Sequence, residues 1–324
     1  MIGLLTKIIN KAKMVWPNLV YLKQGKSIKP LYRFLRPYYV FRHYYPFWRN
    51  VLNQAPKKLY ERDPRILDET QNRIIAELKE NGIAVTHLNE LFRTEFLPQL
   101  QKYATSLIDD RQQRKKGKTY MADFWEKRTN VDLTNPFLKL TLSPRIVAIA
   151  NGYLGMYSKF FTYSLNLVSP VGDAKPISSQ RWHRDPEDKK LCKIFIYLND
   201  VDEETGPFTY AKRTHADGRW NLLFRQNPPQ GSIDIPEKEI ERAISKENIK
   251  VTIGKAGTVI FCDTAGIHRG GYARSKQRLT FTGGFCSPAS LWMPKFLYPS
   301  KEKIKEISDY SVKYALQPWY DHLK

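Results

Sequence analysis

Cysteine is scarce in this chain: the 324 residues contain only Cys192, Cys262 and Cys286, without CxxC spacing. An odd number of cysteines without this spacing argues against a disulfide framework or a zinc knuckle and favours a reducing compartment. Also missing are an apolar run of the ~18–20 residues that a membrane-spanning helix needs and a basic leader before an apolar stretch. Because 42% of the residues are hydrophobic and 13% aromatic, the chain can bury a sizeable core. We expect a globular, cytoplasmic protein.

Acidic residues are absent from residues 1–60, where twelve lysines and arginines stand, and Glu61 is the first carboxylate. The whole chain has 53 basic and 32 acidic residues and a net charge of +21. The segment is rich in aromatic residues, and its first fifteen residues have an amphipathic helical pattern. Three interpretations stay open: peripheral contact with an anionic membrane, a packed extension with solvated basic residues, and a nucleic-acid surface.

The basic N-terminal extension is expected to end at residue 60, and residues 61–324 are expected to form one domain. Pro56–Asp63 has the composition of a linker. Asp68 can cap a helix that stops at Asn81-Gly82, and a longer helix is predicted over Glu90–Asp109. Another helix is predicted to begin at Ser143-Pro144, with serine at the cap and proline in the first turn.

From Lys159 onward the pattern changes to short strand-like runs separated by glycine, proline and aspartate turns. We divide the domain into a helical part (61–158), a β core (159–290) and a C-terminal tail (291–324). Helices followed by many short strands predict an α+β fold, mainly β at its core, with a jelly-roll or barrel architecture.

Three residues in the β part have the chemistry of a metal site. His183 and Asp185 form a His-x-Asp pair at the end of a predicted strand, where side chains two apart point the same way. His268 follows the predicted strand Thr258–Cys262. Two histidines and one carboxylate match the facial triad that holds Fe(II) in non-haem oxygenases.

An arginine follows at the start of the next apolar strand. Arg278 begins the run RLTFTGGF, where a buried guanidinium needs an anionic partner because an unpaired buried charge is costly. A dicarboxylate cosubstrate would supply this partner, because a carboxylate forms a bidentate hydrogen-bonded pair with a guanidinium group. Arg274 is a competing candidate, but the turn residues around it favour a solvated side chain.

The order of these residues resembles the phytanoyl-CoA dioxygenase (PhyH)-like Fe(II)/2-oxoglutarate oxygenases. The resemblance rests on His183 and Asp185, the block DVDEETGPFTYAKRTH (residues 200–215), His268 and Arg278, and it covers residues 160–287. The chain departs from the family's Pro-Gly-Ser-His-type corner, of which only His215 remains. The resemblance does not extend to residues 1–60.

The resemblance implies a double-stranded β-helix (cupin-like) with flanking N-terminal helices, and a role for each candidate residue. His183, Asp185 and His268 would bind Fe(II), and Arg278 would pair with the distal carboxylate of the cosubstrate 2-oxoglutarate. Asn166 would contact the same cosubstrate, and Phe195 would lie beside it or belong to the core.

The implied reaction is hydroxylation of an unactivated C–H bond with O2 as second cosubstrate, releasing succinate and CO2. The substrate class stays open between a small molecule and a lipid- or acyl-type compound. Two alternatives also remain: the same chemistry on a nucleic acid, prompted by the charge of +21, and a non-catalytic β-helix binding protein.

Overall fold

The computed structural model describes residues 32–63, 65–93, 95–109, 114–115, 120–124, 131–172, 174–227, 231–292, 294 and 296–318. The amphipathic helix predicted for the first fifteen residues lies outside this part of the chain.

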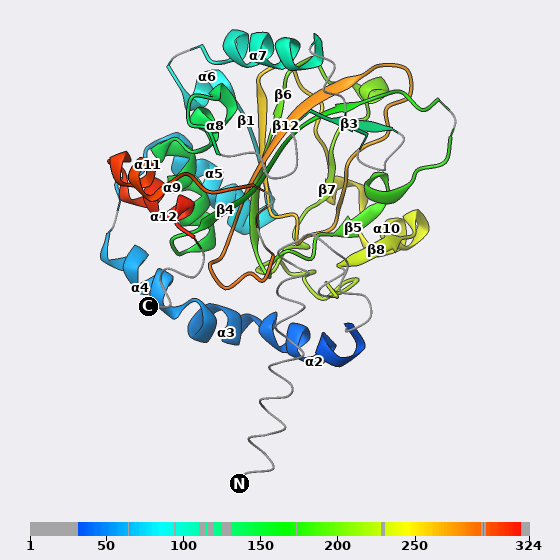
Figure 1. Cartoon of the computed structure of the whole chain (residues 1–324). Coiled ribbons are helices and arrows are strands. Elements are labelled where there is room, and N and C mark those ends of the chain that lie inside the picture. The colour runs from blue at the N-terminus through cyan, green and yellow to red at the C-terminus, as the bar shows by residue number, and fades with distance from the viewer. Residues whose placement is uncertain are drawn as a thin grey trace.

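Two antiparallel sheets form the centre of the molecule (Figure 1). In spatial order, the larger sheet contains β1 (Ile83–His87), β10 (Thr258–Cys262), β6 (Leu191–Tyr197), β12 (Arg278–Cys286), β4 (Lys159–Val168), β3 (Met121–Asp123) and β2 (Arg114–Lys115). The smaller sheet contains β8 (Ser232–Ile235), β5 (Trp182–Arg184), β11 (His268–Arg269), β7 (Thr209–Ala211) and β9 (Ile249–Val251). The predicted mainly β core is confirmed.

Helices surround these sheets, most of them on the larger one. They are α2 (Tyr32–Arg42), α3 (Tyr45–Phe47), the π-helix η1 (Trp48–Leu52), α4 (Gln54–Arg62), α5 (Glu69–Asn81), α6 (Leu88–Leu91), α7 (Leu97–Asp109), α8 (Pro136–Thr141), α9 (Pro144–Leu154), α10 (Glu237–Ala243), α11 (Lys301–Glu306) and α12 (Tyr310–Leu316). Three short 3-10 helices are η2 (Ser178–Gln180), η3 (Glu203–Thr205) and η4 (Lys246–Asn248).

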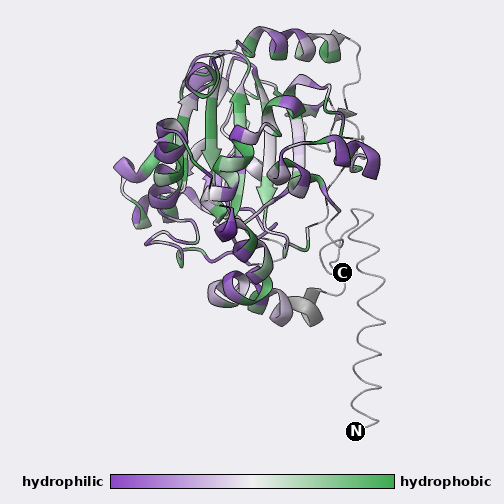
Figure 2. Cartoon of the chain, turned by 90° about the vertical axis from the view of Figure 1, so that its left-hand side faces the viewer, coloured by the Kyte–Doolittle hydropathy of each residue, from purple (hydrophilic) through white to green (hydrophobic). Residues whose placement is uncertain are grey.

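The larger sheet has one face covered by helices and one face turned toward the smaller sheet. Helices α5, α9 and α12 contact β10, β6 and β4, and they gather on one side of the sheet (Figure 1). All five residues of β10 are buried, as expected for a strand covered on both faces. Figure 2 shows the strands mainly hydrophobic and the surrounding helices with polar outer surfaces.

The predicted helix boundaries around α5 and α9 are confirmed. Asp68 caps α5 and accepts a hydrogen bond from the backbone of Gln71, and Gly82 ends the helix with φ 78°. Glycine suits this position because side chains disfavour positive φ. Ser143 caps α9 and accepts from the backbone of Ile146.

The single helix predicted over Glu90–Asp109 is wrong. The chain forms α6 and α7 with Phe92 in an extended conformation between them. Pro98 lies in the first turn of α7, where its missing N–H costs nothing, but inside one continuous helix it would remove a hydrogen bond and clash with the preceding turn.

The predicted linker Pro56–Asp63 is also wrong, because most of it belongs to α4. The preceding residues contact the domain: Trp48 is 1% exposed, and its indole N–H donates to Asp188 Oδ1 at 2.7 Å. Asn53 is fully buried, and its amide donates to Ser287 Oγ. The division at residue 60 stays a prediction, although part of residues 1–60 packs on the domain.

Candidate metal and 2-oxoglutarate site

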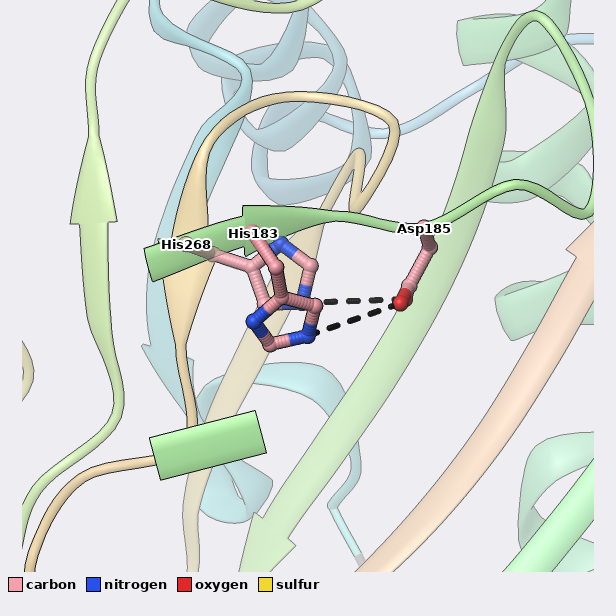
Figure 3. Close-up of side chains that lie close together, drawn as sticks. All are labelled: His183, Asp185 and His268. Atoms are coloured by element: carbon pink, nitrogen blue, oxygen red, sulfur yellow. Dashed lines mark ion pairs between the residues drawn. The ribbon is translucent and has the colours of Figure 1, made fainter. Parts of the chain in front are cut away.

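His183 and His268 occupy neighbouring strands of the smaller sheet. His183 lies on β5 and His268 on β11, and the two residues are register partners of this antiparallel pair. Asp185 directly follows β5, so its carboxylate lies on the side to which His183 points (Figure 3). The structure thus brings together the three residues that the sequence predicts as metal ligands, with one ligand atom from each within 4.8 Å of the others.

Backbone hydrogen bonds orient both imidazole rings. His183 Nδ1 lies 2.8 Å from the carbonyl oxygen of Arg181, and His268 Nδ1 lies 3.0 Å from that of Gly266. A carbonyl can only accept, so each Nδ1 carries the proton and donates. The lone pair is therefore on Nε2, the atom that faces Asp185 in both rings (Figure 3). This arrangement is typical of metal-ligating histidine.

The charge states also suit a divalent cation. Burial lowers the pKa of His268 to about 3, helped by the neighbouring His183. Burial alone would raise the pKa of Asp185, but Lys193 and the two histidines outweigh it and hold that pKa below its usual value. His268 is thus neutral and Asp185 charged at neutral pH, the forms that bind metal.

The spacing of the donor atoms fits one metal ion. Nε2 of His183 lies 3.6 Å from Asp185 Oδ1, and Nε2 of His268 lies 3.6 Å from Oδ2. Two donors at right angles and ~2.1 Å from an octahedral ion are ~3.0 Å apart. If Asp185 binds through Oδ1, the pair of His183 and Asp185 needs a closing movement of about half an ångström. The donor set leaves coordination positions open.

Both sheets contribute to a cavity of about 190 Å³ at this site. Alternate residues of β6 and β12 line it, because side chains two apart in a strand share a face. The lining residues are Met121, Asn166, Val168, Ser179, His183, Asp185, Lys193, Phe195, Tyr197, Phe208, His268, Gly270, Arg278, Thr280 and Thr282.

Arg278 is buried in this cavity with part of its guanidinium unpaired. Its Nη2 donates to the carbonyl of Gly270, whereas Nε and Nη1 have no partner among the described residues. Arg274 is exposed. Burial lowers the pKa of Arg278, but guanidinium remains protonated in proteins. An unpaired buried cation is costly, so the geometry suits an anion at Arg278.

Two more polar groups without partners lie next to Arg278 on the sheet. Asn166 on β4 pairs in register with Thr280 on β12. Asn166 Oδ1 and Thr280 Oγ1 are buried and have no hydrogen-bond partner among the described residues. Buried polar atoms without partners are rare, so their cluster beside Arg278 fits a polar cosubstrate such as 2-oxoglutarate.

Sequence reasoning missed several residues of the cavity. Thr280 and Thr282 follow Arg278 at alternate positions of β12, and Lys193 and Tyr197 flank the predicted Phe195 on β6. Strand alternation could have found them once Arg278 and Phe195 were placed. Phe195 lines the cavity beside Phe208, with ring centroids 4.8 Å apart.

His215, the remnant of the expected corner motif, is buried away from this cavity. Its Nε2 lies 3.0 Å from the carbonyl of Lys79, a contact between the loop after β7 and the end of α5. This contact gives His215 a structural role in joining the loop after β7 to the end of α5.

The fold of the chain is similar to that of the solved proteins SnoN and EctD. The non-heme alpha ketoglutarate dependent epimerase SnoN from nogalamycin biosynthesis matches with a TM-score of 0.51 and 17% identity over 68% of this chain and 84% of that one. Its complex with Fe3+, alpha ketoglutarate and nogalamycin RO gives a TM-score of 0.50 and 16% identity over the same shares. EctD from S. alaskensis with bound Fe gives 0.48 and 16%, over 70% and 81%.

No family model matches the chain, and no curated protein matches it. At these identities the structural likeness concerns the fold. The predicted double-stranded β-helix is confirmed, and it is the fold of the iron- and 2-oxoglutarate-dependent epimerase SnoN.

Proposed function

We propose that the protein is a non-haem Fe(II)- and 2-oxoglutarate-dependent dioxygenase. The observation that carries this proposal is one cavity that contains both the His183–Asp185–His268 cluster and the guanidinium of Arg278, whose Nε and Nη1 have no partner among the described residues. The first is a metal donor set and the second a carboxylate site. The fold shared with SnoN supports the same reading.

His183, Asp185 and His268 would hold iron(II) through the two Nε2 atoms and the carboxylate. Iron with 2-oxoglutarate and O2 supplies the oxidation of an unactivated C–H bond to an alcohol, with succinate and CO2 as coproducts. Protein side chains need not exchange protons with the substrate in such chemistry, because their work is binding and orientation.

The other cavity residues position the cosubstrate and keep the site apolar around it. Arg278 binds the distal carboxylate of 2-oxoglutarate, and Asn166 and Thr280 offer hydrogen bonds along its length. Phe195 and Phe208 form an aromatic wall that reaches His268, since the rings of Phe208 and His268 are 5.6 Å apart. Such a wall limits access of water to the metal.

The substrate is a small molecule, and the PhyH-like resemblance favours a lipid- or acyl-type compound. The bound nogalamycin RO of SnoN is a small molecule. The resemblance on residues 160–287 points toward membership of the PhyH-like family.

The basic N-terminal segment gives the enzyme a peripheral contact with an anionic membrane. Helices α2 to α4 lie as one layer along an edge of the molecule (Figure 1). This layer exposes Tyr38, Phe41 and Tyr44 by 49%, 55% and 60%, and it follows a stretch of basic residues without acids. Exposed aromatic rings beside basic residues suit a lipid headgroup region. No helix among the described residues could itself span a bilayer.

The deciding experiment measures succinate release from 2-oxoglutarate with Fe(II) across a panel of CoA esters, lipids, sugars and oligonucleotides. The proposal requires release that depends on both iron and one substrate class, with a product heavier by one oxygen atom. Turnover only with oligonucleotides would favour the nucleic-acid alternative. Absence of iron and 2-oxoglutarate binding by the purified protein would favour the non-catalytic one.

A further inference from the structure

Lys193 places a buried ammonium group against the metal-site carboxylate. It lies on β6 and points into the cavity, where its side chain is 10% exposed. Its Nζ donates to Asp185 Oδ2 at 2.6 Å and to Glu187 Oε1 at 3.1 Å. A buried lysine keeps its charge only if partners compensate for lost solvation. The two carboxylates do so, and they raise the pKa of Lys193 against the effect of burial.

The backbone of Asp185 is fixed independently of this ion pair. Its N–H donates to the carbonyl of Thr264 at 2.8 Å, and its carbonyl accepts from Gln226 Nε2 at 2.6 Å. What Lys193 can still control is the orientation and availability of the two carboxylate oxygens. Its ammonium group bonds only to Oδ2, which also lies 3.6 Å from Nε2 of His268, while Oδ1 lies 3.6 Å from Nε2 of His183 and has no contact with Lys193.

Carboxylates bind metal ions through one oxygen or through both. If Asp185 bound the metal through both oxygens, it would occupy two of the six octahedral positions instead of one. Two imidazoles, a two-oxygen carboxylate and a chelating 2-oxoglutarate would then fill all six. One position stays open for O2 only if Asp185 binds through a single oxygen.

We propose, on the basis of the proposed function, that Lys193 is a positioning residue. By bonding to Oδ2, it restricts Asp185 to coordination through one oxygen. Glu187 holds the ammonium in place from the other side. The Glu187–Lys193 pair thereby keeps the last coordination position open. Oε2 of Glu187 is buried and has no partner among the described residues, so the side-chain bond to Lys193 is made through Oε1 alone.

The chain offers a matched control in Lys190, which is also buried. Its Nζ donates to Asp217 Oδ2 at 2.7 Å and to the carbonyl of Tyr153 at 3.2 Å. Neither partner belongs to the cavity lining. Lys190→Met removes a buried ion pair of similar kind without touching Asp185, so it reports what the loss of a buried lysine does to the fold alone.

The test compares wild type, Lys193→Met, Lys193→Arg and Lys190→Met as anaerobic Fe(II) complexes with 2-oxoglutarate. Nitric oxide serves as the probe of the open position, because it binds iron(II) as a dioxygen analogue with a distinctive paramagnetic signal. Lys193→Met should bind iron at least as tightly as wild type and nitric oxide at least tenfold more weakly. Lys193→Arg and Lys190→Met should retain nitric oxide binding.

Wild-type nitric oxide binding in Lys193→Met would overturn the proposal, and so would loss of iron from this variant alone. If Lys193→Met does not fold, Glu187→Gln replaces it. That change removes one of the two negative charges that balance the ammonium, because an amide oxygen can still accept its hydrogen bond but carries no charge. Asp185 is then held more strongly by Lys193, so iron should bind severalfold more weakly while nitric oxide binding persists. Tighter iron binding would contradict the proposal. Failure of wild type to bind iron and 2-oxoglutarate would instead refute the proposed function.

Discussion

His183 and His268 face each other across an antiparallel strand pair, with ring centroids 4.2 Å apart. Each ring is fixed by a hydrogen bond from Nδ1 to a backbone carbonyl two residues earlier. The two Nε2 atoms therefore point at the same carboxylate, Asp185, each 3.6 Å away from one of its oxygens. A cation between these groups replaces the repulsion of converging lone pairs by attraction, which is why we regard the site as preformed for metal.

Removal of any one ligand should abolish metal loading and leave the fold intact. We expect His183→Ala, Asp185→Ala and His268→Ala each to lose stoichiometric iron, measured by elemental analysis after anaerobic reconstitution, with unchanged circular dichroism. His215→Ala is the control, because it removes a buried histidine outside the cavity and should retain iron. Wild-type iron content in His268→Ala would show that the third ligand is another residue.

The carboxylate site should depend on Arg278 and not on Arg274. Arg278→Ala removes a buried charge-assisted pair and should weaken 2-oxoglutarate binding by about 2–4 kcal/mol, roughly 30- to 1,000-fold in Kd. Calorimetry of the iron-loaded protein under nitrogen measures this loss. Arg274→Ala, an exposed neighbour, should bind normally; the reverse pattern would exchange the two roles.

Thr280→Val should have opposite effects on stability and on cosubstrate binding. The hydroxyl of Thr280 is buried and finds no partner in the described part of the chain, so replacing it by a methyl group should stabilise the metal-free protein by ~1 kcal/mol. The same change should weaken 2-oxoglutarate binding severalfold because one hydrogen bond is lost. Urea unfolding measures the stability, and calorimetry measures the binding of 2-oxoglutarate. A variant less stable than wild type would show that the Thr280 hydroxyl is hydrogen-bonded in the folded protein.

The N-terminal layer should lose stability in acid through His43. Burial, with smaller repulsion from Lys189 and Arg42, lowers the pKa of His43 to about 4. Between pH ~6.5 and 4 the unfolded chain binds a proton that folded His43 does not, so the free energy of unfolding falls as pH falls.

The neutral, buried ring of His43 contributes about 1–3 kcal/mol to the free energy of unfolding. This contribution is present in full above pH ~6.5 and is lost by pH 4. His43→Phe keeps the ring shape and should show a shallower pH dependence in urea unfolding between pH 7 and 4. An unchanged slope in this variant would assign the acid sensitivity to other groups.

Membrane contact should require both the basic segment and the exposed aromatic residues. Wild type should bind anionic liposomes in a salt-sensitive manner and neutral liposomes poorly. A triple Tyr38→Ser, Phe41→Ser, Tyr44→Ser variant and a chain beginning at Tyr32 should each bind more weakly while keeping iron. Equal binding by all three proteins would exclude this surface.

The sequence alone predicts that a chain beginning near Asp63 stays folded. The contacts of Trp48 with Asp188 and of Asn53 with Ser287 lead us to expect the opposite. Such a chain loses a fully buried tryptophan, which costs about 3–5 kcal/mol, and leaves the Asp188 carboxylate without its indole donor. Thermal unfolding of the two shortened chains, beginning at 32 and at 63, separates these expectations.

Local patterns in the sequence were sufficient to predict the elements of the site. The period of two in a strand places His183 and Asp185 on one side, and the turn-bounded apolar runs predict β10 and β12 within one residue of their ends. Caps at Asp68 and Ser143 act within a few residues, so they are also readable from the sequence.

Contacts across the fold were decided only by the tertiary structure. Which of Arg274 and Arg278 is buried, and whether Lys193 reaches Asp185, depends on the register of strands distant in the chain. The packing of Trp48 under the loop of Asp188 likewise has no local signal, because its partner lies far along the sequence. The amino-acid sequence by itself determined the ligand types, their order and the mainly β core, whereas burial and pairing of charges came from strand register and packing, which no short pattern encodes.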